Sequence, residues 1–221
     1  MKKLIVFILL CTTAILLIIS TGCKQSSMEP ADSGLDSLNF PPHAKKPNIY
    51  IYPTATCSMS VKLEFPLGGT IIKSEPDYGT GWNIKVDPSG KINDEYDYLF
   101  YESVNPDRYQ YTSGWVVCRD SLLTFFTNNL LEAGFTQRET NDFTEYWVPR
   151  LIDDPYYIIY PQSSENINKV IRLEFSIQPD NVLRYFYVIK GTNSNNINLN
   201  VPVIPKFERS GFIVAEWGVV M

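Results

Sequence analysis

One block of helical periodicity lies in the middle of this sequence, and segments with strand periodicity lie on both sides of it. Apolar residues recur at spacings of three and four residues from Leu123 onwards, and Gly134 suits the end of that helix. Thr136 and Glu139 then form a capping-box pattern, which is typical of the start of a second helix. We therefore expect a helical hairpin over residues 120–152.

Several segments have the pattern of strands. Apolar and polar residues alternate in SVKLEF (60–65), GWNIKV (81–86) and VIRLEFSI (170–177), which places their apolar side chains on one face. We also expect strands at VLRYFYVIK (182–190) and GFIVAEW (211–217). The order along the chain is strands, two helices, strands. It favours a single-domain α+β fold, in which a mainly antiparallel sheet carries the helical hairpin on one side.

The N-terminus has the pattern of an export signal, with two lysines followed by an apolar run over residues 4–19. A helix needs roughly 20 apolar residues to cross ~30 Å of hydrocarbon, and this run is slightly shorter. We therefore expect residues 1–22 to be a signal peptide, and an uncleaved N-terminal anchor is the alternative. Either one places the rest of the chain outside the cytoplasmic membrane.

The residues after this run resemble the lipobox of bacterial lipoproteins. Thr21 and Gly22 supply the small residues before the cysteine, whereas Ser20 stands where the motif usually has an aliphatic residue. The resemblance implies cleavage before Cys23 and attachment of a lipid to its thiol. Because two or more acyl chains anchor a protein stably, we expect an extracytoplasmic protein held on a bacterial membrane by an N-terminal lipid.

The segment from residue 23 to residue 46 carries Ser, Pro, Asp and Gly and few large apolar residues. Such a composition buries too little surface to fold alone, which predicts a flexible tether. His43, the only histidine in the chain, would then be a loop residue. Residues 47–221 are enough for one domain with a substantial core.

Charge and residue types exclude several functions. The formal net charge of −5 becomes −7 if Lys2 and Lys3 leave with a signal peptide. A nucleic-acid partner is not expected, because it would require a basic surface. The expected domain contains no histidine, which excludes Ser-His-Asp triads and most zinc sites. Since no phosphate-binding glycine motif occurs either, we expect no cofactor and no metal.

Carboxylates and aromatic rings are the remaining residue types that suit a site. Rings with polar tips are typical of sugar-stacking sites and protein interfaces, and an acid among rings can acquire a shifted pKa. The candidate ligand-binding residues are Glu102, Trp115, Glu216 and Trp217. The alternatives are that both acids are solvated side chains and that both tryptophans belong to the core.

Two classes of function remain. The first is a binding or interaction module of the cell envelope, with a glycan or a protein as its partner. The second is a histidine-free hydrolase that acts on envelope glycans through a pair of carboxylates. The sequence shows no assembled nucleophile and base, so we favour binding and assign no catalytic residue.

Five segments resemble the recurrent motifs of a family of bacterial secreted or lipid-anchored proteins. They are KPNIYIYP (46–53), YLFYE (98–102), GWVV (114–117), YWVPRL (146–151) and FERSGFIVAEWG (207–218). The resemblance spans nearly the whole expected domain and implies that the domain is intact. It implies no activity and no catalytic residue.

Two cysteines, Cys57 and Cys118, lie within the expected domain. Export to an oxidising compartment would permit a disulfide between them, and a bridge that closes such a loop would stabilise the fold by roughly 4 kcal/mol. Two free, buried thiols are the alternative.

Overall fold

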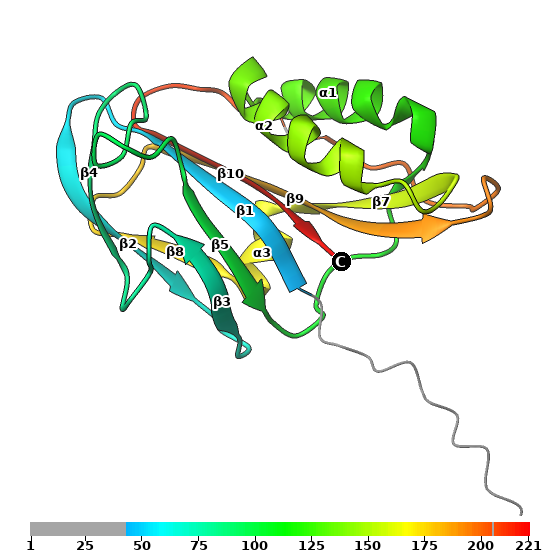
Figure 1. Ribbon diagram of the computed structural model, residues 1–221, viewed down its shortest axis with the longest axis horizontal. Coiled ribbons are helices and arrows are strands. Elements are labelled where there is room, and N and C mark those ends of the chain that lie inside the picture. Colours follow the sequence, from blue (N-terminus) through cyan, green and yellow to red (C-terminus); the bar gives the residue numbers. More distant parts are fainter. Residues whose placement is uncertain (1–42, 205) are drawn as a thin grey trace, which may run out of the picture. The chain divides into compact units, whose positions relative to one another are not determined.

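The computed structural model describes residues 43–204 and 206–221, which form three layers (Figure 1). A seven-stranded sheet lies in the middle, two helices cover one face, and a three-stranded sheet with a short helix lies on the other. The large sheet has the order β3 (Thr70–Glu75), β5 (Leu99–Val104), β1 (His43–Tyr52), β10 (Ile213–Val220), β9 (Asn181–Thr192), β7 (Tyr156–Ser163) and β6 (Trp115–Cys118). The small sheet has the order β4 (Trp82–Val86), β2 (Cys57–Glu64) and β8 (Arg172–Phe175).

Neighbouring strands are antiparallel in both sheets except for β10 and β9, which are parallel. The chain can place these two strands side by side because a long connection, residues 193–212, leads from the end of β9 back to the start of β10. The α+β fold with a mainly antiparallel sheet is therefore confirmed.

The helical hairpin predicted for residues 120–152 is also confirmed. It consists of η1 (Arg119–Ser121), α1 (Leu122–Ala133), α2 (Gln137–Trp147) and η2 (Val148–Arg150). The Thr136 hydroxyl accepts the N–H of Glu139, and the Glu139 carboxylate accepts the N–H of Thr136, which completes the capping box. Gly134 follows α1 with a φ of 106°, in the left-handed region that favours glycine.

A third helix, α3 (Ser164–Val170), joins β7 of the large sheet to β8 of the small sheet. Its length of 7 residues is too short for helical periodicity to be recognised in the sequence. Ile167 and Val170 are its buried residues. This unpredicted helix therefore belongs to the core between the two sheets.

The large sheet is buried on both faces by different partners. On the helical face, Phe143 of α2 packs against Tyr187 of β9 and Trp217 of β10. On the other face, the small sheet contributes Trp82 and its apolar neighbours to a separate core. Since successive residues of a strand point to opposite faces, Glu216 and Trp217 enter different layers.

The folded domain begins earlier than the sequence predicts. β1 starts at His43, and Ala44 pairs with Val220 of β10 and with Ser103 of β5. The prediction of a flexible tether is therefore wrong for residues 43–46, and His43 is a half-buried strand residue and not a loop residue. The pairing comes from two strands that are distant in the sequence, so the composition of the segment itself does not reveal it.

The predicted signal peptide (residues 1–22), the lipid site Cys23 and the tether up to residue 42 lie outside the described residues. Among the helices that the structure describes, none is long and apolar enough to cross a membrane. The anchor is therefore inferred from the sequence alone.

Candidate functional site

The four predicted site residues do not lie together. Glu102 is in β5, and Trp115 is in β6 at one edge of the large sheet. Glu216 and Trp217 are in β10, which is two strands from β5 and three from β6, so the backbones are roughly 10 and 14 Å apart. The predicted grouping is wrong, because strand ends read from a sequence do not give the order of strands in the sheet.

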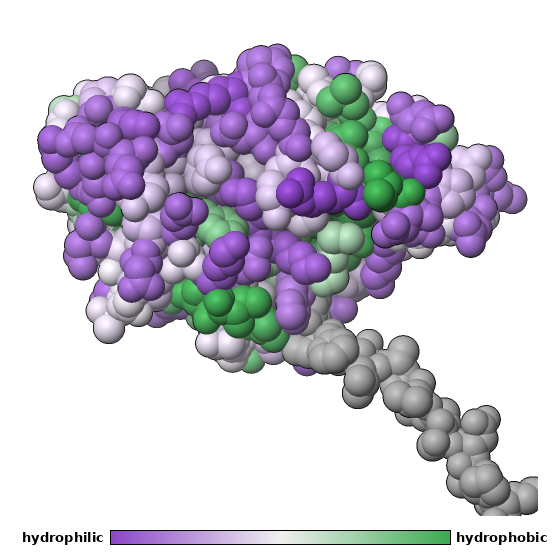
Figure 2. Space-filling view, viewed as in Figure 1, coloured by the Kyte–Doolittle hydropathy of each residue, from purple (hydrophilic) through white to green (hydrophobic). Residues whose placement is uncertain are grey.

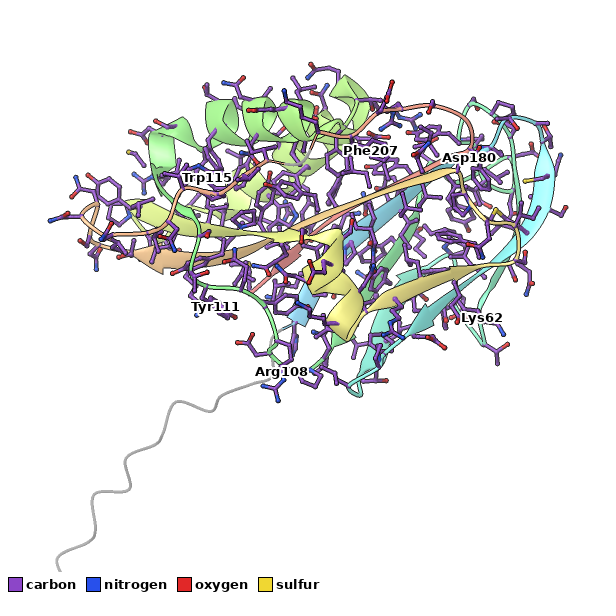
Figure 3. All side chains as sticks on the ribbon, turned by 180° about the vertical axis from the view of Figure 1, so that it is seen from behind. Lys62, Arg108, Tyr111, Trp115, Asp180 and Phe207 are labelled. Carbon is purple, nitrogen blue, oxygen red and sulfur yellow. The ribbon has the colours of Figure 1, made fainter. Side chains whose placement is uncertain are left out.

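Both tryptophans join the sheet to the helical layer. Trp217 is fully buried, and its indole N–H donates to the Glu139 carbonyl of α2 at 2.9 Å. Trp115, which is labelled in Figure 3, is half-buried. It packs edge-on against Phe125 of α1, with ring centroids 5.2 Å apart. The alternative that Trp217 belongs to the core is therefore correct, and Trp115 borders the same core.

Glu102 is half-buried near an enclosed lysine. Lys46 lies at a bulge in β1 with a φ of 51°, and its ammonium is 4.8 Å from the ring centroid of Tyr98 and 4.5 Å from that of Phe100. Burial lowers the pKa of Lys46, whereas the carboxylates of Asp142 and, more weakly, Glu102 raise it. Lys46 therefore holds β1 against β5 by cation–π contacts, and Glu102 contributes to its electrostatic surroundings.

Glu216 belongs to a fully buried polar network. One carboxylate oxygen accepts a 2.5 Å hydrogen bond from Nε of Arg184 in β9, and the other accepts a 2.8 Å hydrogen bond from the Tyr101 hydroxyl. Burial raises the pKa of Tyr101 well above its usual value, and the charge of Glu216 adds to the increase. Desolvation alone would lower the pKa of Arg184, but Glu216 and Tyr101 outweigh it and the pKa is raised. The network is thus an ion pair with a neutral tyrosine.

Among the described residues, the guanidinium of Arg184 has hydrogen-bond partners for two of its three nitrogens. Nη1 donates to Oδ1 of Asn168 at 2.5 Å and to the carbonyl of Ile171 at 2.6 Å. Nη2 is buried and has no hydrogen-bond partner among the described residues. Buried donors are nearly always paired, and an unpaired one costs about 1–3 kcal/mol. This nitrogen therefore marks a place for a water molecule or a ligand.

Arg184 lines a cleft of about 230 Å³ where α3, β8 and β9 meet, and we call it the Arg184 cleft. Polar and apolar side chains share the lining: Ser164, Asn168, Leu173, Phe175, Gln178, Pro179 and Val182. The cleft lies at the β8 edge of the small sheet, between the two sheets. A spare donor beside apolar walls can bind an oxygen acceptor that carries an alkyl group.

The character of the surface on the side shown in Figure 2 indicates a local binding site and not a broad apolar interface. That face is mostly hydrophilic, and hydrophobic residues form small separate groups on it. Large exposed apolar patches are the usual sign of a protein-docking face. A cleft with a specific polar group is therefore the better candidate for the functional site.

A signal for the network was present in the sequence. Arg184 and Glu216 are charged residues within stretches of β9 and β10 whose neighbouring residues are buried. Because a charge in a buried strand requires a partner, each of the two predicts the other. Tyr101 and Asn168 carry no comparable signal, since tyrosine and asparagine are common at many kinds of position.

The suggested disulfide is not formed. Cys57 begins β2 of the small sheet, Cys118 ends β6 of the large sheet, and both are free thiols. Cys57 is partly exposed and Cys118 is exposed, so the alternative of two buried thiols is wrong as well. Within the described part of the chain, no group of three or more His, Cys, Asp or Glu side chains could hold a metal ion.

Comparison with models of known families, with curated proteins and with solved structures found no match to this chain. The resemblance of its five segments to bacterial secreted proteins stays a hypothesis. Function is therefore inferred from the chemistry of the site.

Proposed function

We propose that this chain is a lipid-anchored binding protein of the bacterial envelope, whose folded domain takes a segment of another polypeptide into the Arg184 cleft. The N-terminal apolar run and the lipobox-like residues before Cys23 support the anchor. The buried, unpaired Nη2 of Arg184 carries the binding proposal, because a peptide carbonyl would give this donor the partner it lacks.

An uncharged acceptor suits this cleft better than an anion. Glu216 already matches the charge of Arg184 at 2.5 Å, so a bound carboxylate would add an unmatched negative charge at a buried site. A carbonyl oxygen would accept from Nη2 without adding charge. Leu173, Phe175 and Val182 would contact an alkyl side chain beside it. Every residue of a peptide offers this combination of a carbonyl and a side chain.

The hydrolase alternative has weaker support. Both carboxylate oxygens of Glu216 are engaged, one by Arg184 and the other by Tyr101. Glu102 follows Tyr101 in β5 and therefore points to the opposite face of the sheet. A glycosidase pair must flank one substrate bond, and these two acids are separated by the sheet itself.

Calorimetric titration of the full-length lipoprotein in detergent micelles tests the binding site. The probe is a blocked dipeptide, N-acetyl-alanyl-alanine amide. We expect saturable binding to the wild type and at least tenfold weaker binding to Val182→Trp, because the indole would fill the cleft. Val182 is 37% exposed, so the larger side chain should leave folding unchanged.

Ile72→Trp is the matched control, since Ile72 is 51% exposed and lies in β3, away from the cleft. Its affinity for the dipeptide should equal that of the wild type. Sodium acetate should bind more weakly than the dipeptide. The proposed site would be disproved by equal dipeptide binding to Val182→Trp and to the wild type, or by acetate binding as tightly as the dipeptide.

The anchor has a separate test. Intact-mass measurement of the membrane-extracted protein should show loss of residues 1–22 and a lipid adduct on Cys23. Cys23→Ala should release the protein from the membrane fraction, because the acyl chains supply the stable attachment. Cys57→Ala, which changes a thiol of the folded domain, should remain attached. Unchanged attachment of Cys23→Ala would refute the lipid anchor and favour an uncleaved N-terminal helix.

A further inference from the structure

A second hollow, of about 330 Å³, lies beside the C-terminal end of β7. Side chains from β7, β9, the start of α3 and two loops form its walls, and we call it the Tyr185 pocket: Gln110, Ser113, Pro161, Ser163, Asn166 and Tyr185, with residues 201–203. Tyr185 of β9 is paired with Ser163 of β7 in the sheet. The pocket therefore has a wall of paired strands, which is independent of the Arg184 cleft.

The hydroxyl of Tyr185 has no hydrogen-bond partner in the part of the chain that the structure describes. The side chain is 1% exposed, and no described residue forms a hydrogen bond with its oxygen. The ring is held by Tyr187, with centroids 5.2 Å apart. Burial, and to a smaller extent the charge of Glu132, raises the pKa of Tyr185, so the hydroxyl is neutral and can both donate and accept. A buried hydroxyl of this kind calls for a water molecule or a ligand.

The loop wall of the pocket is held rigidly. The Gln110 amide nitrogen donates to the carbonyls of Ser113 and Pro161, at 2.9 and 2.6 Å. Its amide oxygen accepts the backbone N–H groups of Thr112 and Ser113. These bonds fix the loop that carries Tyr111 beside β7 (Figure 3). This wall of the pocket is thus formed before any ligand arrives, as is usual in small-molecule sites.

The lining is uncharged, which limits the class of ligand. Its described members offer hydroxyl and amide groups together with proline and valine, and none carries a charge. Val201 and Val203 are 84% and 91% exposed and add apolar surface at the rim. An ionic ligand would lose its hydration here without gaining a counter-charge. A sugar has alternating hydroxyl groups and C–H faces, which such a lining can bind without charge.

We propose that the Tyr185 pocket binds a neutral oligosaccharide, with the Tyr185 hydroxyl as a hydrogen-bond partner for a sugar hydroxyl. This site is additional to the Arg184 cleft and does not depend on it. A protein with both sites would hold a polypeptide and a neutral glycan at once.

The test uses the full-length lipoprotein in a polyoxyethylene detergent, because detergents with sugar headgroups would compete. Calorimetric titrations with maltotriose and with triacetylchitotriose supply neutral probes, and trigalacturonate and triglucosamine supply charged ones. We expect at least one neutral trisaccharide to bind, at least tenfold more tightly than either charged trisaccharide. Tyr185→Phe should weaken that binding about fivefold to tenfold, the effect of one lost hydrogen bond.

Tyr185→Phe keeps the ring and removes only the unpaired hydroxyl, so its thermal midpoint should equal or exceed that of the wild type. Tyr156→Phe in β7 is the matched control, because Tyr156 does not line the pocket, and it should bind the sugar like the wild type. Val182→Trp should also keep sugar binding, which separates this proposal from the peptide site. The proposal is overturned if no neutral trisaccharide binds, or if the charged ones bind equally well. Equal sugar affinity of Tyr185→Phe and the wild type would also overturn the proposal and would indicate that the hydroxyl binds a water molecule instead of a sugar.

Discussion

Two fully buried glutamates, Glu139 and Glu216, are each paired with an arginine, and the two arginines differ in how completely they are used. Arg209 donates to Glu139 through both Nη atoms, at 3.1 and 3.0 Å, and to the Gly134 carbonyl. Its side chain remains 25% exposed. Arg184 is 2% exposed, and its Nη2 has no partner in the described part of the chain.

The difference separates a structural ion pair from a candidate site. Glu139 also caps α2, so its pairing with Arg209 holds a C-terminal segment against the start of that helix. The partial exposure of the Arg209 side chain reduces its desolvation cost. Arg184 is almost completely buried, so it bears nearly the whole cost of desolvation. It still leaves a donor unpaired, and an unpaired buried donor adds nothing to a purely structural ion pair. The pair of Arg184 and Glu216 is therefore the better candidate for a ligand-binding site.

The largest effect should come from breaking the Glu216 pair. Glu216→Leu leaves the charge of Arg184 buried without a counter-charge, and we expect a loss of about 3–5 kcal/mol in the free energy of unfolding. Urea denaturation followed by circular dichroism measures it. A loss below about 1 kcal/mol would show that water reaches Arg184 and that the network is not sealed.

A triple variant distinguishes loss of the charge pair from loss of shape. Tyr101→Phe, Arg184→Met and Glu216→Leu together replace the network by apolar groups of similar size, which is often close to neutral for stability. We expect the triple variant to recover most of the stability that Glu216→Leu loses, while dipeptide binding to the cleft stays absent. A triple variant as unstable as Glu216→Leu would contradict the view that the unpaired charge causes the loss.

Breaking the other pair should cost less. Arg209→Met opens a path for water to the Glu139 carboxylate, which also keeps the N–H of Thr136 as a donor. We therefore expect a loss of about 1–3 kcal/mol in urea denaturation, and no change in dipeptide affinity. If Arg209→Met destabilised the protein more than Glu216→Leu, the contrast between the two pairs would fail.

The smallest effect concerns Asp142, a partly exposed acid that accepts the Tyr50 hydroxyl at 2.9 Å. Burial raises the pKa of Asp142 in the folded protein. Its contribution to stability is therefore present below the unfolded pKa and is lost as the pH rises through the folded pKa. Asp142→Asn should gain stability relative to the wild type between about pH 3.5 and pH 7, by less than about 1 kcal/mol because the group is partly exposed.

Urea denaturation of Asp142→Asn and the wild type at both pH values measures this difference. Asparagine keeps an oxygen that can accept from Tyr50, so the hydrogen bond is not the variable. A difference that shrinks as the pH rises would show that the carboxylate is stabilised by its surroundings, like those of the two buried pairs.

Local sequence patterns were sufficient for the helical hairpin and for several of the strands. The capping box of Thr136 and Glu139 and the glycine after α1 act within one or two helical turns, so they are visible in a short stretch of sequence. Alternation predicted β2, β4 and β8 for the same reason. The extension of β1 back to His43 depends on pairing with β5 and β10, which are distant in the sequence. Helix α3 depends on its packing between the two sheets. Neither one has a local signal.

The sequence was enough to establish the class of fold, the helical hairpin and the position of the hairpin between two sets of strands. Which residues could share a site depended on the three-dimensional arrangement. The strand order separates Glu102 and Trp115 from β10, and the alternation of side chains along β10 turns Glu216 away from Trp217. The tertiary structure also brought Arg184 beside Glu216 through the parallel pairing of β9 and β10. The periodicity of side chains is a local property of the sequence, whereas the neighbours of each strand depend on packing across the whole chain. A binding cleft is formed by such neighbours, so its residues cannot be identified from local periodicity.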